Sequence, residues 1–174
     1  MRFFLTIEYD GSEYIGWQRQ NSGLSVQEVV ENSIYKIVQI NLNIYGSGRT
    51  DAGVHATGQV AHVDIITKKF EENRLMDAIN AYLLDHKIKV TDVRKTIDEA
   101  HARFSALSRE YEYVILNRSA PPAIEEGKVW HQRRILNLKK MQEAAGYFVG
   151  THDFTSFRAT QCQSKSPIKT LDEL

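Results

Sequence analysis

The sequence predicts an α+β protein whose first part, residues 1–103, is a ferredoxin-like antiparallel sheet with helices on one face. Two observations support this prediction. Residues with a strand-type alternation precede residues with helical spacing, and the elements then follow in the order strand, helix, two strands, helix, strand. The helices should cover one face of the sheet, which leaves the other face free to bind a partner.

The elements of this first domain can be assigned in order. From Arg2 to Asp10, apolar residues alternate with polar ones, which is the period of a half-buried strand. Ser25 and Glu28 form a capping box, and the apolar residues after them recur at helical spacing to about Asn41. The remaining elements are a short strand, a longer strand, a helix and a fourth strand, expected at Ile44–Tyr45, Gln59–Ile66, Leu75–Leu83 and Ile88–Ile97.

The second part of the chain, residues 104–174, has fewer signals. Alternation over Ser108–Asn117 predicts a strand, in which a tyrosine such as Tyr113 is expected to pack. Val129–Trp130 is expected to be extended, and Ile168–Leu171 to begin a strand. Asn137 can cap a helix whose inner side carries apolar residues, namely Leu138, Met141, Ala145 and Phe148.

Composition restricts the class of protein only weakly. The chain carries 22 basic and 22 acidic residues, so its net charge does not indicate a nucleic-acid binder. The single cysteine, Cys162, excludes an internal disulfide and a multi-cysteine metal site, and a small packed side chain is expected there. No apolar run reaches the ~20 residues that cross a bilayer, and Met1–Glu8 does not resemble a signal peptide, so a cytoplasmic protein is expected.

The most unusual stretch is Gly46–Gly58, called here the Asp51 loop. It holds four of the ten glycines, with Arg49 and Asp51 at its centre. Such a density of glycine predicts a tight, irregular backbone between two regular elements. The two strands expected on either side of it place Asp51 on a shaped loop.

Three interpretations of the Asp51 loop remain open from the residues alone. In the first, which composition favours, Asp51 caps a turn and Arg49 pairs with it. In the second, the glycines bind phosphate, although the loop lacks the usual spacings and its acid would repel an anion. In the third, Asp51 is a nucleophile or an acid–base group, and Arg49 orients it and keeps it ionised.

Residues Gly48–Ala56, with the sequence Gly-Arg-Thr-Asp-Ala-Gly-Val-His-Ala, resemble the signature of the tRNA pseudouridine synthase A family. The rest of the chain resembles the family in the same order, at Glu8–Gly11, Gly16–Gln20, Ser25–Gln27, Gly58–Val60, Phe104–Ala106 and Asp153–Phe157. The resemblance spans essentially all 174 residues. Members of the family continue for several dozen residues more, so the resemblance implies that residues 104–174 are the first part of a second, similar α+β domain that is truncated.

The resemblance also implies a function. Family members isomerise uridine to pseudouridine in the anticodon stem-loop of tRNA, without a cofactor or metal ion, and act as homodimers. Their catalytic aspartate corresponds to Asp51, their base-stacking tyrosine to Tyr111, and the arginine two residues before the aspartate to Arg49. Four further side chains are candidate RNA contacts: Arg19, Gln20, Arg103 and Arg158.

Two other functional classes stay open. The chain could be a catalytically incomplete module that binds RNA, or a hydrolase in which Asp51 activates water, although no second acid lies at a readable spacing. His55 and His62 flank the Asp51 loop at distances that could suggest a metal site. Because no Cys or Glu cluster accompanies them, structural roles are expected for both histidines.

Overall fold

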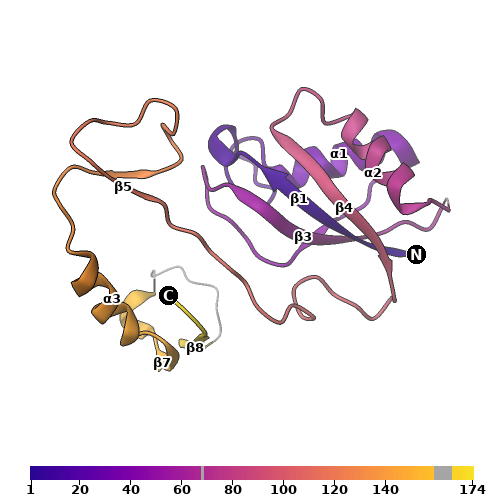
Figure 1. Ribbon diagram of the computed structural model, residues 1–174. Helices are drawn as coiled ribbons and strands as arrows, with labels where there is room; N and C mark the ends of the chain where they lie inside the picture. Colours follow the sequence, from indigo (N-terminus) through magenta and orange to yellow (C-terminus); the bar gives the residue numbers. More distant parts are fainter. Residues whose placement is uncertain (68, 159–165) are drawn as a thin grey trace. The chain divides into compact units, whose positions relative to one another are not determined.

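A four-stranded antiparallel sheet forms the first unit of the chain, Met1–Tyr111, in the computed structural model (Figure 1). The structure describes residues 1–67, 69–158 and 166–174. Its strands are β1 (Arg2–Tyr9), β2 (Tyr45–Gly46), β3 (Ala56–Asp64) and β4 (Ile88–Thr96). They lie in the order β2-β3-β1-β4, and β1 pairs antiparallel with both β3 and β4. This is the ferredoxin-like order, and it confirms the predicted α+β class.

Two helices cover one face of this sheet, α1 (Val26–Val38) and α2 (Glu72–Ala81). Alternate residues of β1 point toward them, and Phe3, Leu5 and Ile7 are fully buried. Burial of a large apolar side chain stabilises a fold by roughly 1.5–3 kcal/mol, so this layer carries much of the unit's stability. Helix α1 begins as predicted, because the hydroxyl oxygen of Ser25 accepts a hydrogen bond from the Glu28 amide at 3.2 Å.

The opposite face of the sheet is partly covered, and the prediction that it is free is wrong at its β3 end. His62 on β3 is only 1% exposed. The Ala102 amide donates a hydrogen bond to His62 Nδ1 at 3.2 Å. The His101 ring lies 4.5 Å from the His62 ring, and the Tyr45 ring lies 5.0 Å from it. The segment after β4 therefore returns across the sheet, and His62 has the structural role expected of it.

Stability should fall as the pH drops through the range in which free histidine titrates. Burial, followed by the charges of Arg2 and His101, holds the pKa of His62 below its ordinary value of 6.5. The unfolded chain therefore binds this proton at a higher pH than the folded chain, and the free energy of unfolding should decrease from about pH 6.5 toward pH 5. Urea unfolding measures this free energy at each pH, and its plot against pH should be flatter for His62→Asn than for wild type. The control His86→Gln should keep the wild-type slope, and equal slopes for all three proteins would contradict this assignment.

The second unit, Glu112–Leu174, contains two small sheets and one helix. Strand β5 (Ile115–Asn117) pairs parallel with β6 (Trp130–Gln132), helix α3 spans Leu138–Gly146, and β7 (Gly150–Asp153) pairs antiparallel with β8 (Ile168–Leu171). The Asn137 side chain caps α3 as predicted, accepting a hydrogen bond from the Lys140 amide at 3.0 Å. The two units meet in the chain at Tyr111, eight residues beyond the predicted domain boundary. That boundary stays a prediction.

Three expectations for the second part of the chain are wrong. Residues 108–114 form no strand, and only Ile115–Asn117 of the predicted segment pairs with a neighbour. Tyr113 is 88% exposed instead of packed, and on the expected inner side of α3, Leu138 is 65% exposed and Met141 is 40% exposed. The physical reason is that no described residue of this unit is fully buried, so its alternating apolar residues have no core to face. Cys162 lies outside the described residues.

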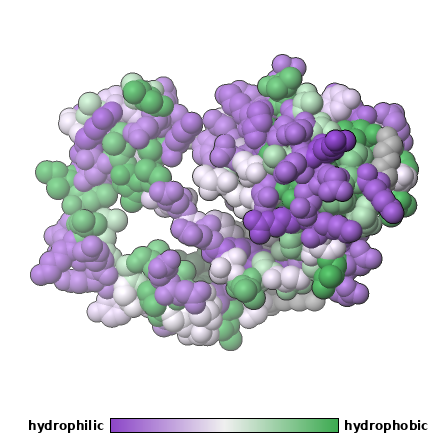
Figure 2. Space-filling model, turned by 45° about the vertical axis from the view of Figure 1, so that its right-hand side comes forward, coloured by the Kyte–Doolittle hydropathy of each residue, from purple (hydrophilic) through white to green (hydrophobic). Residues whose placement is uncertain are grey.

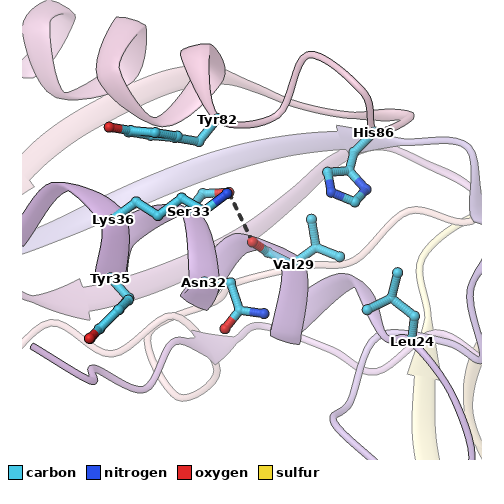
Figure 3. A pocket seen from close by; sticks show the side chains of 8 residues that line it. All are labelled: Leu24, Val29, Asn32, Ser33, Tyr35, Lys36, Tyr82 and His86. Atoms are coloured by element: carbon cyan, nitrogen blue, oxygen red, sulfur yellow. Dashed lines mark hydrogen bonds between the residues drawn. The ribbon is translucent and has the colours of Figure 1, made fainter. Parts of the chain in front are cut away.

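The surface carries a groove on the helical side, between α1 and α2. It has a volume of about 360 Å³, and Figure 3 shows Lys36 and Tyr82 on facing sides of it. The Lys36 ammonium lies 5.3 Å from the centre of the Tyr82 ring. None of the eight lining residues belongs to the Asp51 loop. Hydrophilic residues dominate the visible surface in Figure 2, and none of the helices in the described parts of the chain is long and apolar enough to cross a membrane.

Candidate active site

Asp51 is exposed in the segment that joins β2 to β3. The Val54 amide donates a hydrogen bond to the carbonyl oxygen of Asp51 at 3.2 Å, which closes a four-residue turn. Gly53, the third residue of this turn, has a φ of 78°. A positive φ at this position is typical of a type II turn, which explains the glycine. The prediction of a tight backbone between two strands is confirmed, and the carboxylate is accessible from solvent.

The backbone next to Asp51 is held by the loop that follows β1. The hydroxyl groups of Tyr9 and Thr50 lie 2.8 Å apart and share a hydrogen bond. The Trp17 amide donates to the Thr50 carbonyl at 3.0 Å, and the Gly53 amide donates to the Tyr14 carbonyl at 3.3 Å. Burial is the main cause that raises the pKa of Tyr9, so this hydroxyl stays protonated at neutral pH. Asp51 is therefore fixed from both sides along the chain.

Gly16 makes the close approach of these two loops possible. Its φ is 109°, a conformation that side-chain-bearing residues rarely adopt. A Cβ atom at this position would lie 2.7 Å from the Thr50 carbonyl oxygen and 3.2 Å from the Asp51 carbonyl carbon. These neighbours are backbone atoms, so neither can rotate away. Gly16 is therefore required for the position of Asp51.

Gly16→Ala should displace the Asp51 loop and destabilise the first unit. We expect a loss of about 1–3 kcal/mol in the free energy of unfolding, because the strained φ and the clash with Thr50 act together. Chemical unfolding followed by intrinsic fluorescence measures this loss. Gly146→Ala is the matched control, since a Cβ there would meet nothing within 4 Å and the residue lies in α3. If both substitutions have the same effect on stability, the close packing at Gly16 has no energetic weight.

The opposite end of the Asp51 loop is held by strand β3. The Ser47 amide donates to the Val60 carbonyl at 2.7 Å, and the Ser47 hydroxyl donates to Gln59 Oε1 at 2.9 Å. The Gln59 amide nitrogen then donates to the Gly48 carbonyl at 2.8 Å. One glutamine side chain thus bonds two consecutive residues of the loop, and it explains the glutamine in the Gly58–Val60 motif.

Tyr111 lies beside the same part of the loop. Its hydroxyl oxygen is 3.9 Å from the position that a Cβ on Gly48 would occupy. The ring is 74% exposed, so its faces are available to another planar group. The structure therefore brings Tyr111 to the loop that carries Asp51, although 60 residues separate them in the sequence.

Arg49 and Asp51 are both exposed. Of the ion pairs found within residues 1–67, 69–158 and 166–174, none links these two side chains. Their pairing stays a prediction.

Arg19 lies in a hydrogen-bonded network. Its guanidinium forms an ion pair with Glu31 at 2.8 Å, and the Glu31 carboxylate is nearly buried. The other carboxylate oxygen of Glu31 accepts hydrogen bonds at 3.0 Å from the Ile44 amide and from the Gln27 side chain. Three donors thus satisfy a carboxylate that is almost withdrawn from solvent. The network joins α1 to the start of β2, so Arg19 supports the fold as well as being a candidate RNA contact.

The other three candidate RNA contacts are exposed. Gln20 donates a long hydrogen bond to the Ile15 carbonyl at 3.3 Å. Arg103 lies over the Phe104 ring at 5.9 Å. Arg158 belongs to the second unit, where the Asp153 carboxylate accepts hydrogen bonds from Thr155 that hold the pKa of Asp153 low, with Arg158 as a further cause. The structure thus shows Arg19 and Arg103 in the first unit with Asp51, and Arg158 outside it.

His55 is held against the loop after β1. The Gly11 amide donates to His55 Nδ1 at 3.1 Å, and Asp10 Oδ1 lies at 3.1 Å from the same nitrogen. This contact fixes the end of the Asp51 loop where β3 begins. Within the described residues, no group of three or more His, Cys, Asp or Glu side chains is placed to hold a metal ion.

One residue that contacts this site, Arg109, was not predicted from the sequence. Arg109 donates two hydrogen bonds to the Ser47 carbonyl, from Nε at 3.1 Å and from Nη2 at 2.8 Å. The available signal was its position two residues before Tyr111, which puts both side chains on the same side of an extended chain. Contacts between residues 62 positions apart leave no local pattern in a sequence.

Comparison with known proteins places these features in a family. The profile of a family described as tRNA pseudouridine synthase matches residues 5–105 and 144–174. Proteins named tRNA pseudouridine synthase A are 51% identical in Ehrlichia canis, 49% in Parvibaculum lavamentivorans and 47% in Rhodospirillum rubrum. These alignments cover 100%, 99% and 100% of this chain, and 71%, 70% and 62% of the respective relatives. The chain belongs to the tRNA pseudouridine synthase family, a family of isomerases.

Proposed function

We propose that the chain is a tRNA pseudouridine synthase that isomerises uridine in the anticodon stem-loop of tRNA, with Asp51 as the nucleophile. The observation that supports this most is the placement of an accessible Asp51 on a loop held at both ends, with the exposed ring of Tyr111 beside it. A carboxylate on a loop held in place, with an aromatic ring beside that loop, suits attack on a nucleoside whose base is stacked.

The chemistry needs no oxidant, reductant or external energy source. The carboxylate of Asp51 would attack the nucleoside, at ribose C1′ or at uracil C6, while the C1′–N1 bond breaks. The uracil then turns, and its C5 bonds to C1′ as the carboxylate leaves. Finally C5 loses its proton to a base and N1 gains one, so the atoms of substrate and product are the same. Covalent attachment keeps one fragment in place while the other reorients.

Two side chains would assist Asp51. Tyr111 would stack on the uracil, and its hydroxyl is the candidate to help remove the C5 proton. Arg49 would lie close to the carboxylate in the complex with RNA, where a nearby cation favours the charged form of an acid. Both roles need the base to leave its helical stack, which costs a few kcal/mol.

Contacts with the tRNA backbone would supply the energy that unstacking the base requires. Arg19, Arg103 and Arg158 can contact phosphates, and Gln20 can donate hydrogen bonds to the backbone. Recognition of the tRNA is expected to depend on its shape more than on its sequence. We also propose a homodimer, which rests on the family resemblance and can be measured by sedimentation equilibrium, and a cytoplasmic location, which was expected from the sequence.

Release of tritium from tRNA labelled at uridine C5 tests this function. The substrate is undermodified tRNA, and the enzyme is the chain of 174 residues. An active synthase exchanges the C5 label with water once for each uridine that it converts. Tight binding of tRNA without release would identify the chain as an RNA-binding module instead, and the absence of both would contradict the proposal.

A further inference from the structure

The guanidinium of Arg109 joins two segments of the first unit. Its Nε and Nη2 both donate to the carbonyl oxygen of Ser47, at 3.1 and 2.8 Å, and Nη2 also donates to the carbonyl of Arg103 at 3.0 Å. Ser47 lies in the Asp51 loop, whereas Arg103 lies in the segment that returns from β4. The fixed fork of an arginine can hold such a geometry, but the single rotating ammonium of a lysine cannot.

These contacts set the position of Tyr111 relative to the loop. Arg109 precedes Tyr111 by two residues, and residues 108–114 have no strand partner to place them. Arg109 grips Ser47, while the Tyr111 hydroxyl lies near the next residue, Gly48. Among the described residues, Arg109 and Tyr111 are the side chains of this segment that lie against the loop. Without the guanidinium, Tyr111 alone would remain.

The donors of Arg109 are used on protein carbonyls and not on a carboxylate. It takes part in none of the ion pairs found among the described residues. Charge-assisted bonds from a guanidinium to a carbonyl are stronger than neutral ones. The competing role, a contact with an RNA phosphate, would use the same exposed side chain and would appear as a loss of affinity.

We propose that Arg109 is a positioning residue that couples the Tyr111 segment to the Asp51 loop, so that the stacked base faces the carboxylate. This inference rests on the proposed function for its kinetic part. Its structural part, the tether between Arg109 and Ser47, does not depend on activity. Misplacement of a reacting group by about 1 Å can reduce a rate by roughly 10²-fold, so loss of the tether should reduce turnover without a matching change in affinity.

The experiment compares Arg109→Gln and Arg109→Lys with wild type and with the control Arg74→Gln, an exposed arginine on α2. We expect Arg109→Gln to lower kcat for tritium release by about 10–100-fold, with tRNA affinity changed less than about 2-fold. Arg109→Lys should recover only part of kcat, since it offers one donor group in place of the fork. Arg74→Gln should behave as wild type.

Hydrogen exchange of the backbone amides in residues 46–51 gives a readout without tRNA. Loss of the tether should speed exchange in this segment in Arg109→Gln, and less so in Arg109→Lys. If wild type releases no tritium, the proposed function fails. The hydrogen-exchange rates of residues 46–51 then test by themselves whether Arg109 holds Ser47 in place. An unchanged kcat in both variants, a loss confined to tRNA affinity, or wild-type exchange in residues 46–51 would each overturn the inference.

Discussion

Asp51→Asn is expected to abolish tritium release while tRNA binding persists. Asparagine has nearly the shape of aspartate, and Asp51 contributes only its backbone carbonyl to the described hydrogen bonds of the loop, so the fold should be unchanged. The amide cannot act as the covalent nucleophile, and the rate should fall by at least about 10³-fold. Single-turnover release with excess enzyme measures this loss, and a filter-binding titration measures the affinity.

The matched control for this substitution is Asp77→Asn. Asp77 is also an exposed aspartate, but it belongs to α2 and not to the Asp51 loop. It should retain wild-type release and wild-type affinity. Equal activity of Asp51→Asn and wild type would remove Asp51 from its proposed role, and loss of folding would be detected by circular dichroism.

The second large effect is expected at Tyr111, where two substitutions separate stacking from proton removal. Tyr111→Ala removes the ring, and base–aromatic stacking is worth about 1–3 kcal/mol, so the rate should fall by roughly 10- to 100-fold. Tyr111→Phe keeps the ring and loses the hydroxyl. If the hydroxyl helps remove the C5 proton, Tyr111→Phe should bind tRNA as wild type does but release tritium more slowly.

Tyr113→Ala provides the comparison for Tyr111. Tyr113 is 88% exposed and two residues further along the chain, so its removal costs little packing. We expect less than about a 3-fold change in release, because the base is assigned to Tyr111 alone. A larger loss at Tyr113 than at Tyr111 would show that the base stacks elsewhere.

The regular elements of the first unit could be predicted because their signals are local. The alternation in β1 reflects one buried and one partly buried face, and the cap at Ser25 depends on residues Ser25 to Glu28 alone. The Asp51 loop could be predicted for the same reason, because a dense run of glycines indicates a turn, and the structure has one at Gly53. Local chemistry is sufficient for such features.

The features that prediction missed are contacts over long sequence distances. His62 is covered by Ala102, and Ser47 is held by Arg109, through single side chains that show no periodicity. The strand expected over Ser108–Asn117 failed for a related reason. Alternation shows that a segment can pair, but only a neighbouring strand decides that it does, and residues 108–114 have none.

The claim that Asp51 bonds covalently to the nucleoside can be tested by isolating the bond. In tRNA with 5-fluorouridine in place of uridine, C5 cannot release a proton, so the reaction should stop before completion. Wild type should then form a protein–RNA adduct that survives denaturation, and mass spectrometry should locate it on the peptide that contains Asp51. An adduct on another residue, or one formed equally by Asp51→Asn, would contradict the account.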